Sequence, residues 1–164
     1  FEASLKNKLK NIKLLILDVD GVMTDGGMLY TASGDELKKF NTKDGMGILK
    51  LRDTGIELGI ISSGFSSEIV QKRAEMLRIQ NCYVGREAKI SILQSWITDK
   101  GLKLDQVAMI GDDINDKELM SSIGLAACPA DAVDEIKSIS HVVLKRKGGE
   151  GCIREFIDNY LQKG

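Results

Sequence analysis

Short runs of apolar residues alternate along this chain with stretches in which apolar residues recur at helical spacing. The runs, which are typical of buried strands, lie at residues 12–19, 56–61, 82–84, 106–110, 125–127 and 141–144. The stretches with helical spacing lie between them, at residues 45–54, 66–78, 89–100, 115–122 and 153–161. This alternation predicts an α/β, Rossmann-like fold, in which helices cover both faces of a parallel sheet.

One stretch departs from the alternation. Residues 28–30 and 37–40 are largely apolar, and they flank the turn-like sequence Ala-Ser-Gly-Asp at residues 32–35. Two short apolar arms around such a turn are typical of antiparallel strands. We therefore predict a β-hairpin directly after the first strand.

Length and composition are those of an ordinary globular protein, with 164 residues, of which 43% are hydrophobic and 29% charged. This length fits one domain, which we place at residues 12–164, behind an N-terminal extension or linker at residues 1–11. Because the chain begins with Phe1 and not Met, we expect either a tag remnant or a segment of a longer polypeptide.

Charge and cysteine content argue against several classes of function. Lys and Arg total 23 against 24 Asp and Glu, and aromatic residues make up 5%, so nothing favours nucleic-acid binding. No apolar run approaches the roughly 20 residues of a membrane span, so we expect no membrane partner. The three cysteines (Cys82, Cys128 and Cys152) are odd in number and lack metal-like spacing, which favours a reduced, cytoplasmic setting.

Polar residues collect where the apolar runs end. Parallel sheets bind ligands at the carboxyl ends of their strands, so these positions are the candidate site. They are Asp18 and Asp20, Ser62 and Ser63, and Asp112 and Asp113.

The first of these pairs suits phosphoryl chemistry. Asp18 and Asp20 are two residues apart, so in an extended chain they project to the same side and can share one hard cation. One carboxylate can attack phosphorus, and the other can protonate the leaving oxygen and later activate water. The alternative interpretation is a solvated acidic turn.

The second acidic cluster contains Asp112, Asp113 and Asp116. Three carboxylates within five residues repel one another unless cations or hydrogen bonds compensate. We interpret Asp112 as a Mg²⁺ ligand and the other two as residues that orient metal-bound water or the loop. Helix capping is the alternative, but it explains only one of the three acids.

Two further positions could bind phosphate. Ser62 or Ser63 offers a hydroxyl group and, together with Gly64, backbone N–H groups to phosphate oxygens, although a serine here could simply cap the next helix. Lys89 could neutralise the phosphoryl charge and position Asp18, although most such lysines are merely solvated.

The order of these motifs resembles that of the haloacid dehalogenase superfamily: an Asp-x-Asp pair, a serine, a lysine and a Gly-Asp-Asp-x-x-Asp sequence. The resemblance implies that Asp18 is the nucleophile and Asp20 the general acid/base. It implies that Lys89 and Ser62 or its neighbour bind the phosphoryl group. It also implies that Asp18, the main-chain carbonyl of Asp20 and Asp112 hold Mg²⁺.

The spacing of the motifs leaves no room for the cap domain that members of this superfamily usually insert over the substrate. The chain is similar to the capless branch that includes 3-deoxy-octulosonate 8-phosphate phosphatases, ketodeoxynononate 9-phosphate phosphatases and the C-terminal domain of animal CMP-sialate synthetases. The matching stretches are residues 18–26, 39–45 with 47–48, 111–116, and 148–151 with 154–155.

In that branch, the hairpin closes a homotetramer and the glycine-rich tail of a neighbour helps to cover the active site. The resemblance implies that residues 28–40 form the assembly hairpin, and that Gly149 and Arg154 reach the substrate of an adjacent subunit. The alternative for this tail is a flexible loop before a terminal helix.

The resemblance also implies that the substrate is a keto-deoxy sugar acid phosphate from lipopolysaccharide or sialic acid biosynthesis. Phe65 lies near a substrate-selecting position and is uncharged, and Met76 stands where nine-carbon enzymes have a lysine. Glu150, in contrast, looks like the nine-carbon group. These signals conflict, so the sequence leaves octulosonate 8-phosphate and nononate 9-phosphate both open.

Two other functions fit parts of the pattern. A weakly active or inactive copy would serve the tetramer assembly of a CMP-sialate synthetase, but such copies replace the catalytic acids that this chain retains. A phospho-accepting receiver domain has its accepting Asp on a middle strand, where this chain has Ser62. We therefore predict an active, magnesium-dependent phosphatase.

Overall fold

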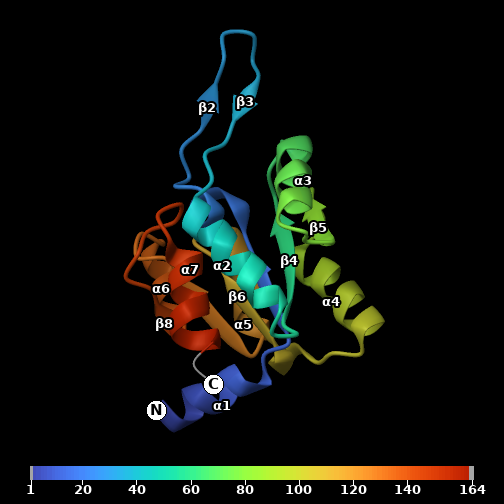
Figure 1. The fold of residues 1–164 in the computed structure, drawn as a ribbon, viewed down its shortest axis with the longest axis vertical. Helices are drawn as coiled ribbons and strands as arrows, with labels where there is room; N and C mark the ends of the chain where they lie inside the picture. The colour runs from blue at the N-terminus through green and yellow to red at the C-terminus, as the bar shows by residue number, and fades with distance from the viewer. Residues whose placement is uncertain (1, 163–164) are drawn as a thin grey trace.

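The computed structural model describes residues 2–162, so residue 1 and residues 163–164 of the predicted ranges lie outside the described part. One sheet has the strand order β5-β4-β1-β6-β7-β8 (Figure 1), and all its neighbouring strands are parallel. The strands are β1 Leu14–Leu17, β4 Glu57–Ser62, β5 Asn81–Val84, β6 Val107–Ile110, β7 Leu125–Cys128 and β8 Val142–Val143. The predicted α/β fold is confirmed.

Helices cover both faces of this sheet. One face packs against α2 (Thr42–Arg52), α3 (Ser67–Met76), α7 (Cys152–Phe156) and α1 (Glu2–Asn11). The other packs against α4 (Lys89–Lys100), α5 (Lys117–Ser122) and α6 (Asp134–Ile139). In the central strand β1, Leu15 and Leu17 point into the first layer, and Leu14 and Ile16 into the second. Because both faces are covered, this strand is a continuous apolar run in the sequence.

The predicted hairpin is present and projects from the carboxyl edge of the sheet (Figure 1). It consists of β2 (Leu29–Tyr30) and β3 (Glu36–Leu37), paired antiparallel so that Leu29 lies opposite Leu37. Pairing of the second arm begins one residue earlier than the predicted range and ends at Leu37. Within residues 2–162, the chain forms only this hairpin and α2 between the turn after β1 and β4, so no cap domain is inserted there.

Two helices were not predicted. The segment expected to be an extension or linker forms α1, whose Leu5 and Leu9 pack against the same core layer as α2 and α7. Helix α6 is short and buries Ile136. None of the helices within residues 2–162 has both the length and the hydrophobicity to cross a bilayer.

Candidate active site

Asp18 and Asp20 lie in a tight turn at the carboxyl end of β1. Asp18 is buried, and its carboxylate accepts a hydrogen bond from the next backbone N–H at 2.8 Å. The turn Val19–Met23 bends the chain at Gly21, which has a φ of 87°. A β-carbon at residue 21 would lie 1.8 Å from Asp112 Oδ2, so both the backbone angle and the adjacent carboxylate require glycine here.

The loop after β6 supplies three more acids, with different roles. Asp113 Oδ1 accepts a hydrogen bond from Ile114 N at 2.7 Å, so this acid is the one that caps the following turn. Asp116 is fully buried, and its Oδ2 accepts a hydrogen bond from Asp112 N at 3.1 Å. Asp18, Asp112 and Asp116 each place one oxygen within 4.8 Å of the others. The acidic cluster consists of these three residues, and we call it the triad. The side chain of Asp20 does not belong to it.

Lys89 begins α4 and is buried among these acids. Its Nζ lies 2.6 Å from Asp116 Oδ1 and 3.3 Å from Asp18 Oδ1. Burial lowers the pKa of Lys89, but the two carboxylates outweigh burial and the pKa is raised overall, so the amine stays charged. The interpretation as a merely solvated lysine is therefore wrong.

Two acids of the triad, Asp18 and Asp112, have pKa values above those of ordinary carboxyl groups. Burial, followed by the charge of Asp116, raises the pKa of Asp18 well above its usual value, although Lys89 opposes this. Burial and the charges of Asp116 and Asp113 raise the pKa of Asp112 to about 7. Asp112 Oδ1 is also buried with no hydrogen-bond partner among the described residues. Only Lys89 offsets the charge of the three carboxylates among the described residues, and their oxygens are the ligands that hard divalent cations prefer, so the cluster fits such a cation.

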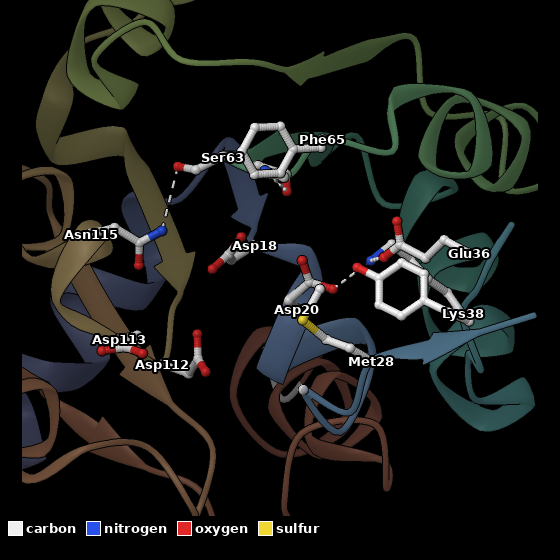
Figure 2. Close-up of a pocket in the computed structure, with 14 residues that line it drawn as sticks. Asp18, Asp20, Met28, Glu36, Lys38, Ser63, Phe65, Asp112, Asp113 and Asn115 are labelled. Atoms are coloured by element: carbon white, nitrogen blue, oxygen red, sulfur yellow. Dashed lines mark hydrogen bonds and ion pairs between the residues drawn. The ribbon is translucent and has the colours of Figure 1, made fainter. Parts of the chain in front are cut away.

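The loop after β4 brings two serines to the same edge of the sheet. Ser62 is buried, and its Oγ accepts a hydrogen bond from Gly64 N at 3.2 Å, which leaves the hydroxyl hydrogen available to a ligand. Ser63 Oγ lies 3.4 Å from Asn115 Nδ2 (Figure 2). Because Ser66 occupies the cap position of α3, neither predicted serine caps that helix.

These loops and the hairpin line an open pocket of about 360 Å³ (Figure 2). Most of its lining residues are polar, among them five carboxylates and one lysine. The lining residues are Asp18, Asp20, Gly26, Met28, Tyr30, Glu36, Lys38, Ser62, Ser63, Gly64, Phe65, Asp112, Asp113 and Asn115. The structure therefore brings the predicted nucleophile, acid/base, metal ligand and serine loop together, with Lys89 packed behind them.

Lys38 and Glu36 also line the pocket, and neither was predicted as a site residue. Lys38 Nζ lies 2.7 Å from Asp20 Oδ1 and 3.0 Å from Glu36 Oε1. The two residues are two positions apart on the returning arm of the hairpin, so their side chains point to the same side. That spacing, on a hairpin that leaves directly from the Asp-x-Asp turn, is the sequence signal that could have revealed them.

Phe65 stands at the edge of the pocket with 82% of its surface exposed. The guanidinium of Arg86 lies over its ring, 4.6 Å from the ring centroid. A cation is thus held beside the uncharged residue that the sequence placed near a substrate-selecting position.

Gly149 and Arg154 do not line this pocket. Gly149 N donates to Val22 O at 3.0 Å, so the glycine-rich segment packs beneath the β1 turn of its own chain. Arg154 lies on α7, and its Nε pairs with Asp158 Oδ2 at 2.7 Å beside a separate hollow. Their predicted contact with an adjacent subunit's substrate stays a prediction.

Comparison with known proteins identifies the family. The family model described as haloacid dehalogenase-like hydrolase matches residues 61–156. The chain belongs to the haloacid dehalogenase-like hydrolases. The 3-deoxy-D-manno-octulosonate 8-phosphate phosphatase of Haemophilus influenzae is 37% identical over 158 residues, which cover 96% of this chain and 87% of the relative.

Solved structures agree with this assignment to the haloacid dehalogenase-like family. The octulosonate 8-phosphate phosphatase of Moraxella catarrhalis, in complex with a magnesium ion, a phosphate ion and KDO, matches with a TM-score of 0.93 and 31% identity, over 99% of this chain and 92% of that chain. The cobalt-bound form of the Haemophilus influenzae enzyme matches with a TM-score of 0.89 and 37% identity, over 94% and 90% of the two chains. The predicted resemblance to this branch is confirmed.

Proposed function

We propose that this chain is a Mg²⁺-dependent phosphatase of a keto-deoxy sugar acid phosphate, with octulosonate 8-phosphate as its preferred substrate. The main support is the triad of Asp18, Asp112 and Asp116, of which the first and the last are buried. It is held with Lys89 at an open pocket lined largely by polar residues. Phosphoryl transfer needs mainly positioning and charge stabilisation, and this cluster offers both. The curated relatives that act on octulosonate 8-phosphate support the choice of substrate.

Asp18 and Asp112, with the main-chain carbonyl of Asp20, are the groups that would hold Mg²⁺. Asp116 already bonds Lys89 and Asp112 N, so its role is to orient these groups. When bound, the ion supplies positive charge that offsets the repulsion between the carboxylates and an incoming phosphate.

In the first chemical step, a carboxylate oxygen of Asp18 attacks phosphorus. The bond between phosphorus and the sugar oxygen breaks, and Asp20 gives its proton to that oxygen, which leaves as the sugar hydroxyl. Lys89, 3.3 Å from Asp18 Oδ1, favours the charged, nucleophilic form of this carboxylate. The product is a phosphoaspartyl group at residue 18.

In the second step, Asp20 takes a proton from water, and the water oxygen attacks the same phosphorus. The bond to Asp18 breaks, and inorganic phosphate leaves with its charge divided among its oxygens. The Ser62 hydroxyl and the backbone N–H of Ser63, both at the lining of the pocket, would donate to these oxygens, while Gly64 N donates to Ser62 Oγ and orients that hydroxyl.

A turnover screen tests this function. Octulosonate 8-phosphate, nononate 9-phosphate, glucose 6-phosphate and other common sugar phosphates are compared by phosphate release in the presence of Mg²⁺. We expect kcat/KM for octulosonate 8-phosphate to exceed that of the common sugar phosphates by about 10²-fold or more, since the acid end of the substrate adds charged contacts. Equal values for all esters would contradict the proposed substrate class, and preference for the nine-carbon ester would correct its length.

We further propose that the hairpin joins copies of this chain into a homotetramer. Met28, Leu29, Tyr30 and Leu37 are each more than half exposed and are grouped on this one hairpin, and exposed apolar residues grouped in this way are typical of subunit contacts. Replacing both Leu29 and Leu37 by Lys should lower the assembly state measured by sedimentation, because four charges would be buried in each pairwise contact. Ser95→Lys, on the exposed side of α4, is the control. An unchanged mass for the hairpin variant would exclude the hairpin as the contact.

A further inference from the structure

We infer that Lys38 is a positioning residue for the general acid/base, one that holds the Asp20 carboxylate toward the leaving oxygen. The inference rests on the proposed function and adds to it a residue of the hairpin. Lys38 Nζ lies 2.7 Å from Asp20 Oδ1, as the dashed line in Figure 2 shows. Its other contact is Glu36 Oε1, at 3.0 Å.

The burial of the two partners indicates which one fixes the other. The side chain of Lys38 is 6% exposed, whereas that of Asp20 is 44% exposed. An exposed carboxylate on a turn can adopt several rotamers, and a bond to a buried, anchored cation selects one of them. Glu36, 13% exposed, anchors the lysine from the hairpin side.

A purely structural role does not account for this arrangement. A lysine that only stabilised the hairpin would be satisfied by Glu36, which lies on the same arm. Besides Glu36, Lys38 contacts a residue 18 positions earlier in the sequence, which also lines the pocket. The two catalytic acids are thus each held by a different lysine: Asp18 by Lys89 from α4, and Asp20 by Lys38 from the hairpin.

A correctly oriented Asp20 accelerates the reaction more when the leaving group is more basic. A sugar alkoxide leaves only if it receives a proton as its bond to phosphorus breaks, and Asp20 supplies that proton. A p-nitrophenolate or acetate group is stable as an anion and leaves without it. Loss of Lys38 should therefore slow the transfer from a sugar phosphate to Asp18 while sparing the transfer from p-nitrophenyl phosphate or acetyl phosphate.

The test measures kcat/KM of the Mg²⁺-loaded Lys38→Met variant on octulosonate 8-phosphate, p-nitrophenyl phosphate and acetyl phosphate. We expect a loss of roughly 10- to 100-fold on the sugar phosphate and less than about threefold on the activated esters, because a general acid contributes about 10²–10⁴-fold in total. Lys39→Met removes the same charge from the next, exposed residue and should leave all three values unchanged. Glu36→Gln, which keeps the lysine, should give a smaller loss of the same pattern.

The Asp20→Asn background gives a second readout. If Lys38 acts through Asp20, then adding Lys38→Met to Asp20→Asn should lower kcat/KM no further. Equal losses on alkyl and activated esters, a change confined to KM, or an additive loss in the double variant would each overturn the inference. A wild-type protein that hydrolyses none of the three esters would instead refute the proposed function, and so the two failures are distinguishable. Thermal unfolding of each variant shows whether it is folded.

Discussion

Asp18→Asn is expected to lower kcat on every phosphate ester by on the order of 10⁴–10⁶-fold, the loss seen when a covalent nucleophile is removed. The amide keeps the shape of the carboxyl group but cannot form the phosphoaspartyl group. Asp18→Ser should lose as much, and it cannot revert to aspartate by deamidation. Phosphate release with Mg²⁺ at saturating substrate measures the effect.

The same substitution should not destabilise the metal-free protein. Burial and the charge of Asp116 disfavour the ionised form of Asp18, as its raised pKa indicates, so a neutral amide removes an unfavourable charge. Lys89 retains its bond to Asp116 at 2.6 Å. We therefore expect the variant to unfold, without metal, at the wild-type temperature or above it.

Asp99→Asn, on the exposed side of α4, is the matched control and should change neither turnover nor unfolding. The combined result separates the proposed nucleophile from a structural acid, because a structural acid would lose stability together with activity. Turnover by Asp18→Asn at a substantial fraction of the wild-type rate would rule out the nucleophile assignment.

The main features of the fold were predictable because the buried strands are continuous apolar runs in the sequence. In β1, four consecutive apolar residues fill both core layers, and the chain turns at the first acid that follows. Helix α1 was not predicted because its apolar side is short. Leu5 and Leu9 pack against the core, but two leucines among charged residues do not make a clear helical period in the sequence. Helix α6 has six residues, too few for a helical period to emerge.

The sequence allowed us to predict which strand ends form the site, but not the role of each acid in it. Parallel strands bring Asp18, Ser62 and Asp112 to one edge whatever the loops do. The loop conformation after β6 decides that Asp113 caps a turn while Asp116 holds Lys89, and strand position alone does not determine this.

Lys38 was harder to predict, because its two-residue spacing from Glu36 indicates only that both side chains point to the same side of the hairpin. Its contact with Asp20 depends on how the hairpin leaves the β1 turn and returns across the pocket, which is a property of the whole path of the chain. The expected role of Gly149 and Arg154 concerns a second copy of the chain. Within one copy, Gly149 donates a hydrogen bond to the carbonyl of Val22, and Arg154 pairs with Asp158.

Removal of Mg²⁺ by a chelator is expected to abolish turnover, and resupply to restore it, with a dependence on pH that follows from Asp112. Burial and the charges of Asp116 and Asp113 raise the pKa of Asp112 from 3.8 to about 7. Between these values, the folded metal-free protein holds a proton that the unfolded chain releases. The stability of the metal-free protein should therefore fall as pH rises from about 3.8 to about 7.

The stabilisation of the fold by Mg²⁺ should instead increase with pH, because the ion must displace the proton of Asp112 to bind. At pH 8, Mg²⁺ at roughly 100 times its Kd should stabilise the fold by about 2.7 kcal/mol. For a chain of this size, such a gain raises the unfolding temperature by about 5–10 °C. Near pH 5, the curves with and without the ion should nearly coincide, because the proton then competes effectively for the carboxylate.

Asp112→Asn isolates the group responsible for this dependence. It should remove the Mg²⁺-induced shift at every pH and reduce the fall in metal-free stability between pH 4 and 7, while Asp18, whose pKa is also raised, keeps part of that fall. Asp99→Asn should retain both effects. A Mg²⁺-induced shift of equal size at pH 5 and pH 8 in the wild-type protein would mean that the ion binds away from Asp112, because the affinity of an ion held by this carboxylate must depend on its protonation.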